Sequence, residues 1–139
     1  MQIRTATHGD AAAIAPLLEQ LGHPSTEAQV VARLKAMPPG EDVLVSEDEG
    51  RITGVASLHL IPVIHEDAPV AMLTSLVVDE SERGRGVGRA LVMQAEALAA
   101  ARGATRMILT SRMSRIGAHA FYERLGFDKT SYRFTKTIR

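Results

Sequence analysis

Residues 76–92 read LVVDESERGRGVGRALV, and along this stretch an apolar run gives way to alternating glycines and then to a helical pattern. The run Leu76, Val77, Val78 ends a predicted strand over residues 70–78, and its unbroken apolar character favours a strand covered on both faces. The helix that follows is predicted from apolar residues that recur on one face, namely Val87, Leu91, Ala95 and Leu98. The stretch therefore predicts a strand, a glycine loop and a helix in direct succession.

The loop between this strand and this helix has the composition of an anion site. Its three glycines and three arginines are Gly84, Gly86, Gly88, Arg83, Arg85 and Arg89. Glycines let main-chain N–H groups approach a ligand closely, and the unpaired N–H groups and positive dipole of a helix N-terminus point at it. Arginine adds charge-assisted hydrogen bonds. We expect residues 83–89 to hold the pyrophosphate of a nucleotide-type cofactor; the competing interpretation is a glycine-rich turn with solvated arginines.

Two common phosphate-binding motifs do not fit this loop. A P-loop needs a Lys followed by Ser or Thr after its last glycine, and no such pair is present. A Rossmann fingerprint has two residues between its second and third glycines, whereas only Val87 lies between them here. The next strand also ends in Thr110 and Ser111, where that fingerprint requires an acidic residue. The sequence thus argues against a P-loop nucleotide and against NAD.

The remaining segments predict a mixed α/β fold. A helix capped by Asp10 should end at Gly22, and a second helix should run from a capping box at Thr26 to Pro38. Further strands are expected at 43–46, 52–61, 106–110 and 132–138, and a further helix at 118–125. In the last strand, Tyr132 and Phe134 should point inward. We expect one domain over residues 1–139, with a sheet covered by helices on both faces.

Composition limits the function classes. Sixteen basic and sixteen acidic residues cancel, which argues against a nucleic-acid-binding protein. The chain has no Cys, which excludes disulfides, thiolate nucleophiles and cysteine-ligated metals, and we expect no metal site. No apolar stretch is long enough to cross a bilayer and the N-terminus does not resemble a signal peptide, so we expect a cytoplasmic protein without a membrane partner.

Two motifs, in order, resemble those of the GNAT acetyltransferase superfamily. The strand end at residues 76–79 followed by Arg83, Gly84, Arg85, Gly86, Val87, Gly88 is similar to that superfamily's motif A, and AHAFYERLGF at residues 118–127 is similar to its motif B. The resemblance implies a single-domain, largely antiparallel mixed sheet and acetyl-coenzyme A as acetyl donor. It also implies an amine as acceptor.

The resemblance further implies roles for individual residues. Residues 83–89 would bind the pyrophosphate, and Leu76, Val77 and Val78 would pair with the pantetheine arm. Ser111, Ala118 and Phe121 match positions near the cofactor. Tyr122 stands where the family places its general acid, and a phenol with a pKa near 10 stays protonated at neutral pH. The amine would then attack the thioester directly in a ternary complex.

Several roles stay open on the sequence. Tyr122 can instead pack beside Phe121, His119 is expected to pack or cap, and Arg124 either reaches a phosphate or is solvated. An alkylamine has a pKa of about 10.4, so its proton must be removed, yet residues 71–75 lack the Glu that many relatives place on that strand. The base is then a water relay or one of three side chains, namely His59, His65 and Glu66.

The acceptor and the assembly are not defined by these motifs. Residues 57–60 and 132–136 are similar to the aminoalkylphosphonate N-acetyltransferases, but the similarity rests on short stretches. Aminoglycosides, amino acids and protein amines are alternatives. The missing acidic residue on the strand motivates a second hypothesis, a non-catalytic acyl-coenzyme A sensor. The resemblance also allows a homodimer.

Overall fold

The computed structural model describes all residues from Met1 to Arg139, which form two compact units, Met1–Ile108 and Leu109–Arg139. In chain order the elements are β1 (Gln2–Thr5), the 3-10 turn η1 (His8–Asp10), α1 (Ala11–Leu21), α2 (Glu27–Ala36), β2 (Glu41–Asp48), β3 (Arg51–Ile61), β4 (Val70–Val78), the 3-10 turn η2 (Glu80–Glu82), α3 (Val87–Ala101), β5 (Met107–Leu109) and α4 (Ile116–Arg124). The organisation as one domain stays a prediction.

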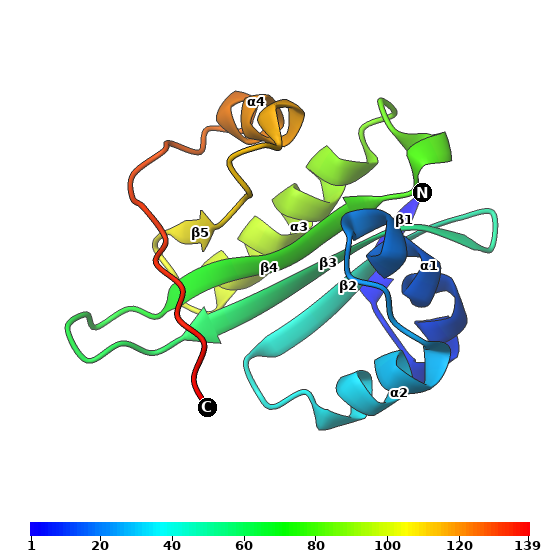
Figure 1. The fold of residues 1–139 in the computed structure, drawn as a ribbon, viewed down its shortest axis with the longest axis horizontal. Coiled ribbons are helices and arrows are strands. Elements are labelled where there is room, and N and C mark those ends of the chain that lie inside the picture. The colour runs from blue at the N-terminus through cyan, green and yellow to red at the C-terminus, as the bar shows by residue number, and fades with distance from the viewer. The chain divides into compact units, whose positions relative to one another are not determined.

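The five strands form one sheet in the order β1-β2-β3-β4-β5 (Figure 1). Strands β1 to β4 lie side by side in chain order, and each neighbouring pair is antiparallel. The register shifts twice, and the second shift leaves Thr74 of β4 as an extra residue, because Ser57 pairs with Ser75 and Leu58 with Leu73. The expected α/β fold with a largely antiparallel sheet is confirmed.

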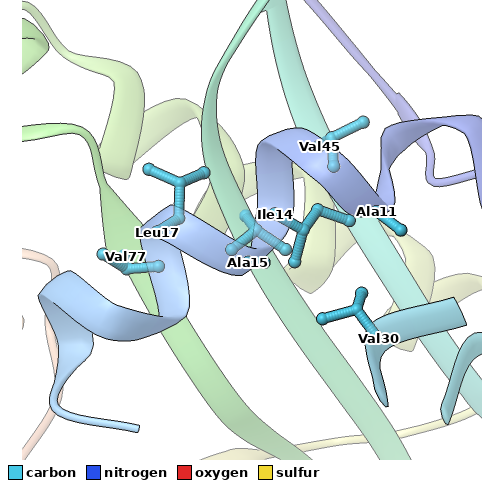
Figure 2. Packing of buried hydrophobic residues seen from close by; sticks show 8 residues of the cluster. Ala11, Ile14, Ala15, Leu17, Val30, Val45 and Val77 are labelled. Atoms are coloured by element: carbon cyan, nitrogen blue, oxygen red, sulfur yellow. The ribbon is translucent and has the colours of Figure 1, made fainter. Parts of the chain in front are cut away.

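Helices cover both faces of the sheet in the first unit. On one face, α1 and α2 pack on β2, β3 and β4, and Figure 2 shows this core from close by. Its buried members are Ala11, Ile14, Ala15, Leu17, Val30, Val45, Val55 and Val77. On the other face, Leu58 and Ala71 of the sheet pack with Ala99 of α3.

The helix ends follow from local sequence signals. Gly22 ends α1 with a φ of 97°, a left-handed conformation that favours glycine. At the start of α2, Thr26 Oγ1 accepts from the Gln29 amide at 3.1 Å, and the Thr26 amide donates to Gln29 Oε1 at 2.9 Å, which confirms the capping box. Asp10 differs from the expectation, because its carboxylate makes no cap hydrogen bond to α1. It accepts from the Thr7 amide and from Arg4 instead.

The predicted strand over residues 132–138 is wrong. The segment after α4 has no regular secondary structure, and the expected inward residues Tyr132 and Phe134 are 87% and 94% exposed. From residue 128 onward its main chain makes no hydrogen bond, and Arg133 Nη1 donating to Thr110 Oγ1 at 3.3 Å is the one polar contact of these residues. Alternation of apolar and polar residues favours a strand only where a neighbouring strand supplies hydrogen bonds, and this segment has no such partner.

No helix combines the length and apolar character needed to cross a bilayer.

Candidate functional site

The glycine loop connects β4 to α3 in the first unit. Val78 ends β4, η2 follows, and α3 begins at Val87, whose side chain is buried and anchors the helix start. Gly84 and Gly86 have φ values of 80° and 83°, and a Cβ atom added to either would meet nothing within 4 Å. Both positions therefore require glycine for their backbone conformation, and they border open space.

The main chain of this loop offers unpaired donors. None of the amides of residues 83–89 donates a hydrogen bond within the chain, and the first bond of the helix runs from the Ala90 amide to the Gly86 carbonyl at 3.0 Å. Gly86 is the N-cap and supplies no side-chain cap. These N–H groups lie at the helix N-terminus, which is the positive end of the helix dipole. They are therefore suited to binding an anion.

The three arginines of the loop differ in their partners. Arg85 pairs with Glu82 at 3.3 Å, and Arg83 donates through Nε to the Val78 carbonyl at 3.3 Å. Arg89 is exposed and forms no ion pair. The guanidinium groups of Arg83 and Arg89 are thus free of carboxylates and remain available to a ligand.

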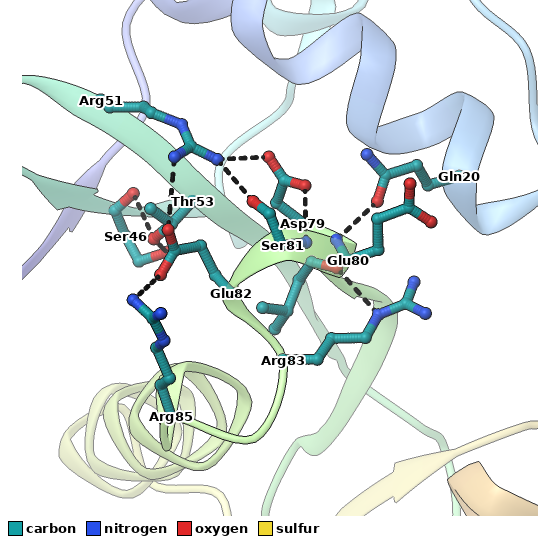
Figure 3. A network of polar contacts seen from close by, with 11 residues as sticks. Gln20, Ser46, Arg51, Thr53, Asp79, Glu80, Ser81, Glu82, Arg83 and Arg85 are labelled. Carbon is teal, nitrogen blue, oxygen red and sulfur yellow. Dashed lines mark hydrogen bonds and ion pairs between the residues drawn. The ribbon is translucent and has the colours of Figure 1, made fainter.

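Arg51, which the sequence analysis did not single out, organises the acidic turn that precedes the loop (Figure 3). Its guanidinium donates to Asp79 Oδ2 at 2.7 Å, to Ser81 Oγ at 2.9 Å and to Glu82 Oε1 at 3.3 Å. The Arg51 hydrogen bond lowers the pKa of Asp79, and the amide of Ser81 lowers it further. Because Arg51 offsets two carboxylates, the turn repels an incoming anion less than its sequence suggests.

Strand β4 leaves part of its outer edge free beside the loop. The inner edge pairs with β3 along the whole of Val70–Val78. On the outer side, β5 is only three residues long, and the Ala71 amide donates to the Arg106 carbonyl at 3.2 Å. The neighbouring strand is therefore met at the beginning of β4, which leaves residues 76–78 without a strand partner on that side, although the Val78 carbonyl accepts from Arg83 Nε.

The second unit carries the other predicted site residues. Ser111 Oγ is buried and makes no hydrogen bond, while Ala118 and Phe121 of α4 are half-buried. The ring of Tyr122 lies edge-on to Phe121 and Phe127, with centroids 5.4 Å and 5.9 Å away. Burial raises the pKa of Tyr122 above its usual 10, and Arg115 opposes this. Tyr122 is therefore a neutral phenol at physiological pH.

Two other polar residues of α4 are His119 and Arg124. His119 Nε2 lies 2.7 Å from the Arg112 carbonyl, which gives this ring a packing and capping role. Arg124 is exposed and makes no ion pair.

The three candidate bases lie in different surroundings. Glu66 is paired with Arg106, which lowers its pKa and makes it a weak proton acceptor at neutral pH. His65 lies in the exposed β3–β4 connection. His59 lies within the sheet, beside Glu41 of the adjacent strand.

This region combines an open glycine turn, unpaired amides at a helix start and a strand edge that is partly free. These features define a class of proteins that bind an extended, anionic, nucleotide-type ligand. The sequence model of the Acetyltransferase (GNAT) family matches residues 13–127, so the chain belongs to the GNAT acetyltransferase family. Members of this family take the acetyl group from acetyl-coenzyme A.

Three relatives illustrate the match. Over 89 residues the chain is 34% identical to the aminoalkylphosphonate N-acetyltransferase of Salmonella typhimurium, covering 64% of this chain and 58% of that protein. It is 31% identical to the aminoglycoside N(6')-acetyltransferase type 1 of Stenotrophomonas maltophilia, covering 92% of this chain and 86% of that protein. The crystal structure of a Trypanosoma brucei acetyltransferase superposes with a TM-score of 0.83 at 28% identity, covering 99% of each chain.

Proposed function

We propose that this protein is an N-acetyltransferase that moves the acetyl group of acetyl-coenzyme A to an amine. The observation that carries the proposal is the loop at residues 83–89, whose amides are all unpaired at the start of α3. Family membership supplies the identity of the ligand, and the free amides and arginines fit its pyrophosphate.

The pyrophosphate lies on the loop in this proposal, with Gly84, Gly86 and Gly88 admitting it to the main chain. Arg83 and Arg89 are the arginines without a carboxylate partner, so they bind its oxygens most readily, and Arg85 contributes if it leaves Glu82. The pantetheine arm extends along the free edge of β4 at residues 76–78 and bonds to its main chain as an added strand would.

Three residues of the second unit are also proposed contacts of the cofactor. The buried hydroxyl of Ser111 has no partner within the chain, so a polar group of pantetheine would satisfy it. Ala118 and Phe121 supply half-buried apolar surface on α4 for the arm of the cofactor. The main-chain amide at Val77 or Val78 is the donor proposed for the oxyanion of the tetrahedral intermediate.

Tyr122 is the proposed general acid for the departing thiolate. Its raised pKa keeps the proton on the phenol throughout the neutral range. Since a thiol has a pKa of about 8.5, complete proton transfer from this phenol is uphill by at least about 2 kcal/mol. Tyr122 therefore acts first by donating a hydrogen bond to the sulfur as the C–S bond breaks, and the amine attacks directly without an acyl-enzyme.

The deciding experiment measures thiol release from acetyl-coenzyme A against a panel of aminoalkylphosphonates, aminoglycosides and amino acids. The first two classes are included because relatives are named for them. Tyr122→Phe should lower kcat about 100-fold and leave the Kd of coenzyme A within about twofold, because a general acid contributes about 10²–10⁴ to the rate.

Tyr132→Phe is the matched control, since Tyr132 is the other tyrosine and is exposed. It should leave both constants unchanged. Equal kcat for Tyr122→Phe and the wild type across pH would remove the acid assignment.

A second candidate, an acyl-coenzyme A sensor, is favoured by the lack of any acidic or basic side chain on β4. It predicts that coenzyme A binds while no amine in the panel is acetylated. We also propose that the protein resides in the cytoplasm. From the tendency of its family to form dimers, we propose a homodimer, and light scattering tests this. Nucleic acid and membranes are not partners in this proposal.

A further inference from the structure

One end of the sheet face beneath α1 and α2 is half open, and polar side chains lie there. Val45 and Val55 on this face are buried under the helices. Because side chains alternate between the two faces of a strand, Glu41 of β2 and His59 of β3 lie on the same face, beyond the end of that apolar cluster. Their side chains are 18% and 33% exposed, so a small ligand can reach this end of the sheet.

Glu41 and His59 are direct partners across the β2–β3 pair. The Nδ1 atom of His59 is buried, makes no hydrogen bond of standard geometry, and lies beside the carboxylate oxygen Oε1 of Glu41. A carboxylate at Nδ1 favours the tautomer that keeps a proton there, which leaves Nε2 as the proton acceptor.

His59 is also a direct cross-strand partner of a residue in β4. It pairs with Met72, and cross-strand partners have Cβ atoms about 5 Å apart. Beyond the next pair, Leu58 and Leu73, lies the bulge, where Ser57 Oγ and Thr74 Oγ1 are 2.6 Å apart. His59 is thus a titratable side chain one strand away from the strand that carries no acid or base of its own.

We propose that His59 is the general base of the transfer reaction and that Glu41 is its positioning residue. This inference rests on the proposed function, which places the thioester along β4. The acceptor amine then lies over the open end of this face, above Met72 and the Thr74 bulge. Nε2 of His59 reaches the amine directly or through one water molecule.

The proton balance is as follows. The acceptor R–NH₃⁺ gives one proton to Nε2, its nitrogen forms a bond to the thioester carbon, and the C–S bond breaks. The thiolate takes a proton from Tyr122, and the second nitrogen proton, released as the amide forms, returns through water to Tyr122. The imidazolium of His59 finally loses its proton to bulk solvent, so the reaction releases one proton in total.

His8 and Asp42 line the same cavity as Glu41. Glu41 faces His59 from β2, and Met72 faces it from β4 without charge. Asp42 follows Glu41 on the opposite face of the strand and is paired with Arg102.

The test compares His59→Gln, Glu41→Gln and Glu41→Asp by kcat, KM and their pH profiles, with coenzyme A affinity as the check on folding. At pH 7, His59→Gln should lower kcat about 100-fold with the Kd of coenzyme A unchanged, and the acid limb of kcat/KM should move up toward the pKa of the acceptor amine. The loss should shrink above about pH 9.5, or with an acceptor amine that is already neutral at pH 7, because ordinary alkylamines then need no base.

Glu41→Gln should lower kcat by about tenfold, since His59 loses the carboxylate that fixes its tautomer, and Glu41→Asp should restore part of the rate. His23→Gln, at an exposed loop residue, is the control and should match the wild type. The proposal is overturned if His59→Gln keeps the wild-type kcat and acid limb, or if His65→Gln changes them instead. A wild type that acetylates no amine would overturn the proposed function itself, and this assignment with it.

Discussion

Gly54 and Gly86 show two different reasons for a glycine beside the same site. Gly86 has a left-handed backbone next to open space. Gly54 lies in β3 opposite Val78, and a Cβ there would come within 3.0 Å of Leu91 Cδ1 and of Ser46 Oγ and within 3.1 Å of the Val77 carbonyl. The missing side chain at Gly54 lets α3 approach β4, so it sets how the loop at the helix start meets the strand end.

Replacing Gly54 by Ala should lower the free energy of unfolding by about 1–3 kcal/mol, as is typical for overpacking a filled core. Urea denaturation measures this directly. The matched control is Gly117→Ala, a helical position in α4 where an added Cβ meets nothing within 4 Å. That change should be neutral or stabilise by up to about 1 kcal/mol. A Gly54→Ala protein as stable as the wild type would show that α3 does not pack this closely.

Local structure was predictable where its cause is local in sequence. The glycine loop and the Thr26 capping box depend on neighbours within a few positions, and the backbone conformation of the loop and the paired hydrogen bonds of the box are those expected. Arg51 and the His59–Glu41 pair could not be found this way. Arg51 contacts Asp79 across the sheet, and His59 meets Glu41 only because of the β2–β3 register. Single-sequence periodicity does not determine register.

At the scale of elements, Asp10 links η1 to the edge of the sheet. Its carboxylate accepts two hydrogen bonds from Arg4 at 2.8 Å each and one from the Thr7 amide at 2.7 Å. Arg4 also binds Glu47 at 2.9 Å, so β1, β2 and the start of α1 share one ionic network. The hydrogen bonds from Arg4 hold the pKa of Asp10 at about 2, although burial opposes the shift.

This network makes stability depend on pH in the acid range. A carboxyl whose pKa is lowered on folding stabilises the native state above its unfolded pKa of 3.8, and the gain is lost as the pH falls toward 2. Asp10→Asn should therefore lower the free energy of unfolding by about 2 kcal/mol at pH 7. It should also flatten the dependence of stability on pH between about 4 and 2.

Urea denaturation at a series of pH values measures both effects. Asp128→Asn, at an exposed position after α4, serves as the control and should reproduce the wild-type curve. A parallel displacement of the Asp10→Asn curve, with an unchanged slope below pH 4, would contradict the role given to the ionised carboxylate.

Helices and strands were predictable where the spacing of apolar residues and the residues that start or end an element agree. α1 to α4 and β2 to β5 all appear near their expected positions. The segment at 132–138 shows the limit of this reasoning, because alternation describes one face of a strand but does not supply a partner for its main chain. The cap assigned to Asp10 failed for a related reason, since Arg4, six residues away, binds the carboxylate more strongly than a helix amide does.

At the scale of the whole molecule, the residues with proposed roles belong to two different units. The loop at residues 83–89, the edge of β4 and the His59–Glu41 pair all belong to Met1–Ile108. Ser111, Ala118, Phe121 and Tyr122 belong to Leu109–Arg139. Both buried clusters of the sheet and its helices are drawn from the first unit. Binding of the pyrophosphate and loss of the thiolate are thus assigned to different parts of the chain.

A fragment of residues 1–108 should therefore fold and keep coenzyme A binding while losing transfer. Its core residues are all present, so circular dichroism should show a cooperative thermal transition, at a lower Tm because β5 is cut short. Calorimetry should find coenzyme A bound within about tenfold of the full-chain Kd, a loss of about 1.4 kcal/mol for the contacts assigned to Ser111 and Phe121. Acetyl transfer should fall by about 100-fold or more without Tyr122.

The full chain carrying Tyr122→Phe is the control for this fragment, because it removes the acid while keeping the second unit. If the fragment and that variant lose transfer equally, the second unit contributes to the rate mainly through the phenol. If the fragment is far slower, the unit also binds or orients the cofactor arm. A fragment that folds but no longer binds coenzyme A would contradict the central assignment, because the free amides of residues 83–89 would then not be sufficient to hold the pyrophosphate.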